Sequence, residues 1–302
     1  MSSTPWRLGL LVLLLGALGA ESRASDLDSE PGQALNLFQR VARADLVVHV
    51  RVHDGSLRFA LVDVLEALKG DPPAQRLRVA FRDYNFYRKP GAEPIIFPNG
   101  QQEVLFLVKY DQIRRKEKNK DIYELFPGAE GRITVPEEGS AMILQAVRRL
   151  AGLAGKDPVA QIDGLTSLLE SDNPVLLGAA LDEVRRLRVA DASLYGRLVA
   201  LLRSPAPGVR GRALRLVAEV FASPGGGGQD DQPDQGEVAL AAVLERARND
   251  PNEDVRVEAV AALATWPVRR QVEEDLKAIA ALDPAQAVRY EAQRILFGRH
   301  GP

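Results

Sequence analysis

The apolar residues in the second half of the chain recur with the period of an α-helix. The clearest example is the stretch 250–266, DPNEDVRVEAVAALATW, in which valine, alanine and leucine fall on one face. Asp250 and Pro251 set a turn before this face, and Asn252 or Asp254 can cap the start of a helix. The pattern predicts a helix whose buried stripe consists of Val255, Ala259, Val260 and Leu263.

The same frame occurs four times along the chain, which indicates an internal repeat. Each copy has a valine followed four residues later by an alanine, with a proline in or next to the preceding turn. The spacings between successive valines are 34, 46 and 33 residues. In the last three copies an arginine follows the valine directly, whereas the first copy has Leu176 there. The valines are Val175, Val209, Val255 and Val288, and the arginines are Arg210, Arg256 and Arg289.

The long spacing contains a polar insert at residues 223–236, SPGGGGQDDQPDQG. This insert has no apolar side chain, so it cannot bury enough surface to offset the entropy lost on ordering, and we expect it to be disordered. Removing about 13 of its residues restores a period near 33. Each unit then contains two helices, and neighbouring units must stack because one helix pair cannot bury its own apolar face.

This unit resembles the HEAT repeat, which has two helices and an Asp-x-x-Val-Arg-x-x-Ala type of signature. Here the signature reads Asp254-Val255-Arg256 with Ala259, and Ala287-Val288-Arg289 with Ala292. The resemblance covers about residues 157–299, within a predicted repeat domain at 157–302. It implies a curved α-solenoid that binds a partner on its concave face, without implying a reaction. It also implies two roles for the repeat arginines, which either pair with acidic residues of the next unit or face a ligand. An unrelated helical bundle is the alternative.

The N-terminal segment 1–25 has the pattern of a secretory signal peptide. Arg7 precedes an apolar core of 11 residues, Leu8–Leu18, and small residues follow it. This core is shorter than the roughly 20 residues that span a bilayer, although a retained anchor is the alternative. A lipoprotein anchor would need a cysteine, and the chain contains none. We therefore expect a periplasmic or secreted protein without disulfides and without an integral membrane segment after cleavage.

Between these regions the period changes from that of a helix to that of a strand. After a short helix expected at 34–43, apolar and polar residues alternate from Leu46 to His53, and further strands are expected at 57–65 and 76–82. Residues 104–110 are almost continuously apolar, as in a strand that is covered on both faces. Shorter strands are expected at 122–126 and 132–135. Five or six strands in about 90 residues suggest a small barrel over 44–136.

This barrel region is similar in outline to the OB-like barrels of the netrin-like and metalloproteinase-inhibitor class, as an exported bacterial module. The similarity depends on Ala44-Asp45-Leu46-Val47-Val48, on Leu68-Lys69-Gly70 and on Val104-Leu105-Phe106-Leu107. Members of that class carry cysteines, and the inhibitors among them coordinate zinc through an N-terminal cysteine. This chain has no cysteine, so protease inhibition by that route does not carry over. The predicted fold class is therefore a multidomain β + α chain: a small OB-like β-barrel, a linking helix at 137–156 that covers the first repeat, and an all-α HEAT-like solenoid.

Two surfaces of the barrel region are candidate partner-binding sites. The excursion 83–100 carries large apolar side chains among proline and glycine, and these must either fold over the barrel mouth or contact a partner. The run 114–120, RRKEKNK, is a predicted hairpin tip that either binds an acidic partner or anionic lipid headgroups, or is a solvated loop that discourages edge pairing. The candidate residues are Tyr84, Phe86, Tyr87 and Phe97 in the excursion, and Arg114, Arg115 and Lys116 in the tip.

The sequence carries no recognisable catalytic or cofactor motif. It has no Gly-x-Ser-x-Gly elbow and no phosphate-binding glycine loop. His49 and His53 share a strand face, but their Cα atoms would lie about 13 Å apart, too far for two ligands of one zinc ion. The formal net charge of −2 does not suggest nucleic-acid binding.

These observations predict an exported, non-catalytic interaction or scaffold protein that binds a protein or peptide partner and needs no metal or other cofactor. An envelope enzyme or accessory subunit with an unrecognised site is one alternative. A module that binds a polysaccharide or a lipid surface through the barrel is the other.

The signal pattern makes a direct prediction about the mature N-terminus. Because small residues follow the apolar core, cleavage should leave a chain that starts between Ala20 and Ser25. Edman sequencing or intact mass spectrometry of the protein from its native host measures this start. Recovery of a chain that still begins at Met1 would contradict export by this signal.

Overall fold

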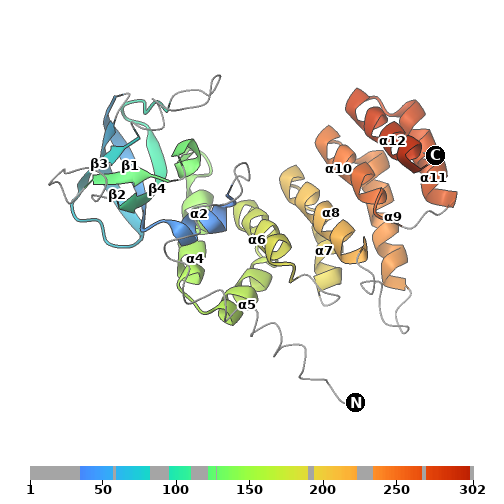
Figure 1. Cartoon of the computed structure of the whole chain (residues 1–302), viewed down its shortest axis with the longest axis horizontal. Helices are drawn as coiled ribbons and strands as arrows, with labels where there is room; N and C mark the ends of the chain where they lie inside the picture. Colours follow the sequence, from blue (N-terminus) through green and yellow to red (C-terminus); the bar gives the residue numbers. More distant parts are fainter. Residues whose placement is uncertain are drawn as a thin grey trace, which may run out of the picture. The chain divides into compact units, whose positions relative to one another are not determined.

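The chain forms two compact units in the computed structural model, residues 1–164 and residues 165–302. The first unit contains all of the strands of the described residues, and the second contains helices only. Figure 1 shows both units, coloured along the sequence. The structure describes residues 35–56, 59–81, 95–109, 122–126, 128–189, 194–222, 234–266 and 270–299.

Five strands of the first unit close into a β-barrel. Neighbouring strands pair in the ring β1–β2–β3–β5–β4–β1, in which β3 and β5 are parallel and the other pairs are antiparallel. A sixth strand, β6, pairs with β4 on the edge that β5 also uses, so these two strands follow one another along β4. The strands are β1 (Leu46–Gly55), β2 (Phe59–Lys69), β3 (Arg76–Ala80), β4 (Gln102–Lys109), β5 (Ile122–Leu125) and β6 (Arg132–Thr134).

Alternation along the strands selects the side chains inside the barrel. Leu46, Val48, Val50 and Val52 of β1 all belong to the barrel core and are 0–2% exposed. Register shifts interrupt the pairing of β1 with β2 at three places. Such bulges add local twist and bend, which a short barrel needs in order to close. The alternation predicted from the sequence is therefore confirmed.

The segment 95–101, which includes the described end of the excursion, contributes two side chains to the barrel core. Ile95 and Phe97 are both buried, at 2% and 3% exposure, and the Phe97 ring lies 5.0 Å from the ring of Phe81. The guanidinium of Arg132 covers the same ring at 5.0 Å. Phe97 was expected either to contact a partner or to fold over the barrel mouth, and its buried ring belongs to the barrel core.

A helix before the first strand packs on the outside of the barrel. Helix α2 (Leu37–Arg43) starts with a capping box in which Asn36 and Gln39 bond each other's backbone amides. At its C-terminal end, the ammonium group of Lys69 donates to the carbonyl oxygens of residues 41, 42 and 44. Burial lowers the pKa of Lys69, with the charge of Asp45 opposing this. The lysine thus ties the C-terminal end of α2 to β2.

The next residue, Gly70, lets the chain leave β2 at this point. It has a φ of 74°, and a Cβ atom there would lie 2.7 Å from the carbonyl oxygen of Asp45. A residue with a side chain would meet both a conformational penalty and a backbone clash.

The expected linking helix belongs to the barrel unit. Helix α4 (Ser140–Ala154) packs against α2 and β2, as Figure 1 shows for the two helices. Arg148 on α4 makes two hydrogen bonds, of 2.6 and 2.7 Å, to the carboxylate of Glu66 on β2. The boundary between the two units falls inside the next helix, α5 (Pro158–Leu168).

The second unit is a series of helix pairs, as the repeat predicts. Each repeat valine lies near the start of the second helix of a pair, and all four later alanines are buried. The second helices are α6 (Pro174–Leu187), α8 (Pro207–Ala222), α10 (Glu253–Leu263) and α12 (Gln286–Arg299), and the first helices after α5 are α7 (Tyr195–Leu201), α9 (Asp234–Asn249) and α11 (Arg270–Leu282).

One boundary differs from the sequence expectation. The polar insert was expected to run to Gly236, but α9 begins at Asp234, so residues 234–236 are helical. Polar residues can extend a helix beyond its apolar face because the backbone hydrogen bonds of an added turn do not require packed side chains. Residues 223–233 of the insert lie outside the described residues.

A buried carboxylate lies in the barrel next to the closing segment. Glu103 has a fully buried side chain on the side of β4 that also carries Leu105 and Leu107. Its Oε1 atom accepts a hydrogen bond from Thr134 at 3.3 Å and lies 3.7 Å from Arg132. Its Oε2 atom has no hydrogen-bond partner among the described residues. Burial raises the pKa of Glu103, with Arg132 and Thr134 acting in the opposite direction.

This carboxylate should make the barrel less stable as the pH rises. A raised pKa in the folded state means that the protonated form favours folding below the unfolded pKa, and that this contribution disappears as the pH passes the folded value. Glu103→Gln should therefore stabilise the protein at pH 7 by about 1 kcal/mol, because a buried charge is removed, and the gain should vanish near pH 4. Urea titrations at several pH values measure this. The exposed Glu138→Gln serves as the control; an equal effect there, or a destabilised Glu103→Gln at pH 7, would contradict the prediction.

Candidate functional site

The structure describes four of the ten predicted site residues. Phe97 lies in the barrel core, and the three repeat arginines lie on the second helices of the last three repeats. The other six, Tyr84, Phe86, Tyr87, Arg114, Arg115 and Lys116, lie outside the described residues. The repeat arginines are therefore the predicted site that the structure can test by geometry.

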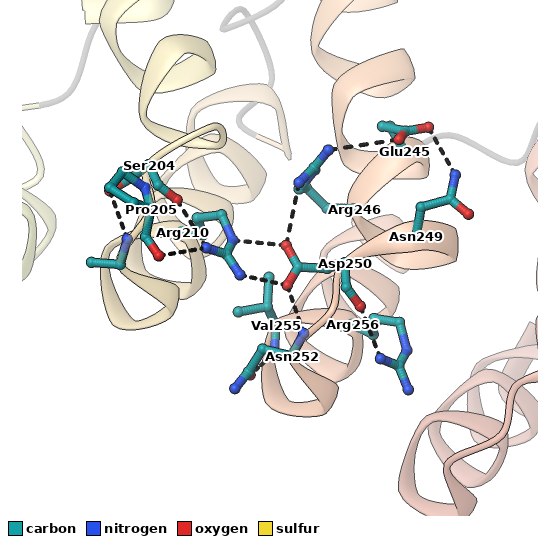
Figure 2. Close-up of polar contacts among 11 residues, drawn as sticks. Ser204, Pro205, Arg210, Glu245, Arg246, Asn249, Asp250, Asn252, Val255 and Arg256 are labelled. Atoms are coloured by element: carbon teal, nitrogen blue, oxygen red, sulfur yellow. Dashed lines mark hydrogen bonds and ion pairs between the residues drawn. The ribbon is translucent and has the colours of Figure 1, made fainter.

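The first of them, Arg210 on α8, makes a buried ion pair across a repeat junction. Its Nε and Nη2 atoms donate to the two carboxylate oxygens of Asp250 at 2.7 and 2.6 Å (Figure 2). The side chains of Arg210 and Asp250 are only 7% and 0% exposed. The Nη1 atom of Arg210 donates to the carbonyl oxygens of Ser204 and Pro205 in its own turn. One guanidinium thus joins two successive turns.

Arg256 on α10 repeats this arrangement one unit later. Its Nε and Nη2 atoms bond the carboxylate of Asp283 at 2.9 and 3.1 Å, and its Nη1 atom donates to the carbonyl oxygen of Asp250 at 2.9 Å. Each aspartate also accepts a backbone amide two residues later, from Asn252 and from Ala285. The carboxylates therefore fix their own turns as well as the junction between repeats.

The pKa of Asp250 follows from these contacts. Burial by itself raises the pKa of this carboxyl, but hydrogen bonds from Arg210 and the Asn252 amide, with the charges of Arg210 and Arg246, reverse the effect and lower it. Asp250 is therefore held as a carboxylate, and its guanidinium partner is neutralised inside the protein.

The pair occurs only where both partners are present in the sequence. The turn before α8 has Ser204 at the place of Asp250 and Asp283, and the preceding helix α6 has Leu176 at the place of the arginine. Leu176 is buried, at 2% exposure. A buried carboxylate at position 204 would have no guanidinium partner, and an unpaired buried charge is strongly destabilising. The absence of the aspartate therefore agrees with the absence of the arginine. Of the two roles expected for the arginines, the structural one describes Arg210 and Arg256.

More exposed ion pairs also join neighbouring second helices at the surface. Arg212 binds Asp182 at 2.9 Å between α8 and α6, and Arg215 binds Glu258 between α8 and α10. Each such pair contributes little because water screens it. They nevertheless show which faces of the second helices meet at a junction.

Arg289 on α12 differs from the other two repeat arginines. Its Nη1 atom donates to the carbonyl oxygens of Asp283 and Pro284 at 2.6 and 2.9 Å, as its equivalents do in their turns. No ion pair joins Arg289 to a carboxylate of the described residues. The Nε and Nη2 atoms, which bond an aspartate in Arg210 and Arg256, therefore bond no carboxylate of the described residues in Arg289.

Large apolar side chains are exposed on the same helix pair. Leu282, Phe297 and Tyr290 are 80%, 76% and 67% exposed, which makes them the three most exposed large apolar side chains of the described residues. Tyr290 and Phe297 are seven residues apart on α12 and so lie on one helix face. Sequence reasoning missed them. Aligning the repeats would have found them, because Gly211 and Ala218 take their places in α8.

The histidines of the barrel have ordinary polar neighbours. His49 bonds Gln102 at 2.9 Å, and His53 lies 3.6 Å from Asp63. Within the part of the chain that the structure describes, no three His, Asp or Glu side chains are grouped as ligands for a metal ion. Over the same residues, no helix combines the length and the apolarity needed to cross a bilayer.

Comparison with known proteins assigns no family to this chain. No family model matches the chain, and no curated protein matches it. Among solved structures, it is similar to a designed armadillo repeat protein, with 20% identity, a TM-score of 0.34, and coverage of 52% of this chain and 73% of that chain. Function must therefore be inferred from the contacts of the chain itself.

The buried pair predicts a strong and pH-dependent effect of Asp250→Asn. The asparagine can keep the bond to the Asn252 amide but leaves Arg210 buried without a negative partner, so it should destabilise the protein by about 3–5 kcal/mol at pH 7. Because the pKa of Asp250 is lowered on folding, its contribution is present above the unfolded pKa and lost as the pH falls through the folded value. The difference in the free energy of unfolding between variant and wild type should thus become smaller in acid.

Urea denaturation followed by circular dichroism between pH 7 and pH 3 measures both effects. The exposed Asp172→Asn is the matched control, and it should change the free energy of unfolding by no more than about 0.5 kcal/mol. The double variant Arg210→Met, Asp250→Leu should be more stable than Asp250→Asn alone. A loss below about 1 kcal/mol for Asp250→Asn would show that the pair is not the constraint described above.

Proposed function

We propose that this chain is an exported, non-catalytic interaction protein that binds a protein or peptide partner. The observation that supports this most is the exposure of Tyr290 and Phe297 on one face of α12. Large exposed apolar side chains grouped on a surface mark interaction sites, and aromatic residues are favoured there because they bury much area with few rotatable bonds. We name the face of Arg289, Tyr290, Arg294 and Phe297 the α12 end face.

We also propose that the barrel is OB-like and that the helix pairs are HEAT-type repeats. The five-stranded ring with one parallel pair supports the first identification. The arginine and aspartate that recur at fixed places in the second-helix frame support the second. Both identifications are compatible with binding, and neither implies a reaction.

The aromatic excursion and the basic tip remain proposed contact sites for the same or another partner. Ile96 is exposed to 56%, so the described end of the excursion offers one apolar side chain to the solvent. The basic tip would suit an acidic partner.

The proposal predicts that the double variant Tyr290→Ser, Phe297→Ser loses its partner. Both side chains are mostly exposed, so the melting temperature should stay within a few degrees, whereas a bound aromatic anchor usually contributes 2 kcal/mol or more to the complex. Capture from envelope extract, quantified by mass spectrometry against wild-type bait, should fall more than tenfold.

A matched control uses two exposed apolar residues on other helices, Val159→Ser and Val238→Ser, which are 44% and 51% exposed in the wild type. Their capture should equal that of the wild type. Equal capture by the Tyr290 and Phe297 variant, or equal losses in both variants, would contradict a binding role for α12.

A further inference from the structure

Helix α8 provides an internal template for what α12 can bind. Two of its three arginines, Arg210 and Arg215, bind the carboxylates of Asp250 and Glu258 in the next helix pair, whereas Arg212 binds Asp182 on α6. Between them lies Gly211, which is buried and at which a Cβ atom would lie 3.9 Å from the Cγ atom of Glu258. This face of α8 therefore receives a turn aspartate and, eight residues later, a glutamate on the following helix.

Helix α12 repeats the charged half of this template. Arg289 and Arg294 stand at the places of Arg210 and Arg215 in the repeat frame. The carbonyl oxygens of Asp283 and Pro284 hold the Arg289 guanidinium in the way that the carbonyls of Ser204 and Pro205 hold Arg210. The arginine is thus oriented before any partner arrives, which lowers the entropy lost on binding.

The apolar half of the template is enlarged on α12. Tyr290 and Phe297 replace Gly211 and Ala218, and both of those residues are buried at the α8 junction. In α6 the same two places hold Leu177 and Val184, which are also buried, at 5% and 0% exposure. In these two helices the positions are covered by packing, whereas on α12 the side chains are larger and mostly exposed.

Arg289 and Arg294 on α12 can bind an outside carboxylate without losing a strong ion pair within the described residues. Arg289 forms no ion pair with a carboxylate of the described residues. Arg294 pairs with Glu291 on its own helix, with side-chain exposures of 58% and 16%. A pair between residues three apart at the surface contributes only a few tenths of a kcal/mol, so a carboxylate from outside can replace it.

We infer that the α12 end face binds a helical hairpin of a partner protein that places a carboxylate in its turn against Arg289. A second carboxylate on the following helix would meet Arg294, and apolar residues of the hairpin would cover Tyr290 and Phe297. This inference rests on the proposed function and adds the chemistry of the partner: an acidic turn that leads into an amphipathic helix. Two parallel N–H···O bonds from a planar guanidinium give that carboxylate both strength and direction.

The closing experiment selects binders from a displayed library of two-helix hairpins of one repeat length. The bait is the full-length protein, and the library randomises the turn residue and the residue eight positions later. With wild-type bait, Asp or Glu should be enriched at the turn position. Selected hairpins should then bind Arg289→Lys at least tenfold more weakly, because the ammonium can still bond the carbonyls of its turn but lacks the planar fork. The exposed Arg203→Gln is the control and should bind like the wild type.

The outcomes separate this inference from the proposed function. Binders that need Tyr290 and Phe297 but show no acid enrichment and bind Arg289→Lys unchanged would overturn the acidic-turn inference and leave the binding role intact. A selection that yields no hairpin dependent on Tyr290 and Phe297 would overturn the inference, while the capture experiment above decides the proposed function independently. Sedimentation of the wild-type chain belongs to the same test: self-association that Arg289→Lys abolishes would assign this face to a second copy and overturn a hairpin partner.

Discussion

The repeat unit depends on one buried contact, the pair between a guanidinium on one second helix and a carboxylate in the next turn. Arg210 with Asp250 and Arg256 with Asp283 each satisfy all charged atoms of the carboxylate while the arginine also holds its own turn. A buried pair of this kind adds modest net stability, since desolvation offsets much of the attraction. Its larger effect is on geometry. A buried aspartate without an arginine partner destabilises the fold, so a turn that carries this aspartate must follow a helix that carries the arginine.

The barrel unit is held together by a different balance of forces. Its core is a continuous apolar cluster, closed by Phe97 and Phe81, and its polar contacts mainly attach helices to the outside. Lys69 binds the carbonyl oxygens at the C-terminal end of α2, and Glu66 accepts hydrogen bonds from Arg148 on α4. Glu103 is the exception, a buried carboxylate whose Oε2 atom has no hydrogen-bond partner among the described residues. With no cysteine in the chain, burial and these contacts must hold this unit without disulfides.

The same repeat physics gives a consistent view of function. At the α8 junction Arg210 is paired with a carboxylate, and the two positions that are aromatic on α12 hold Gly211 and Ala218, which are buried. On α12 the arginine lacks a carboxylate partner among the described residues, and two aromatic side chains are exposed. A surface that repeats the charges of a known internal interface and adds apolar area is suited to binding an element like the one it holds internally. We propose an interaction role for the α12 end face on this basis.

The sequence by itself determined the periodic features of this protein. The spacing of Val175, Val209, Val255 and Val288 predicts the helix pairs, and alternation along Leu46–Val52 predicts the inside of a barrel, because side-chain direction follows directly from a local period. Pairing of the repeat arginines with acidic residues of the next unit is one of two roles that the HEAT resemblance implies, and the sequence alone does not choose between them. Only the tertiary structure decided that Phe97 lies in the barrel core, that β3 and β5 run parallel, and that Tyr290 and Phe297 stay exposed. Each of these depends on residues distant in sequence that cover a side chain or fail to cover it, and no local pattern contains that information.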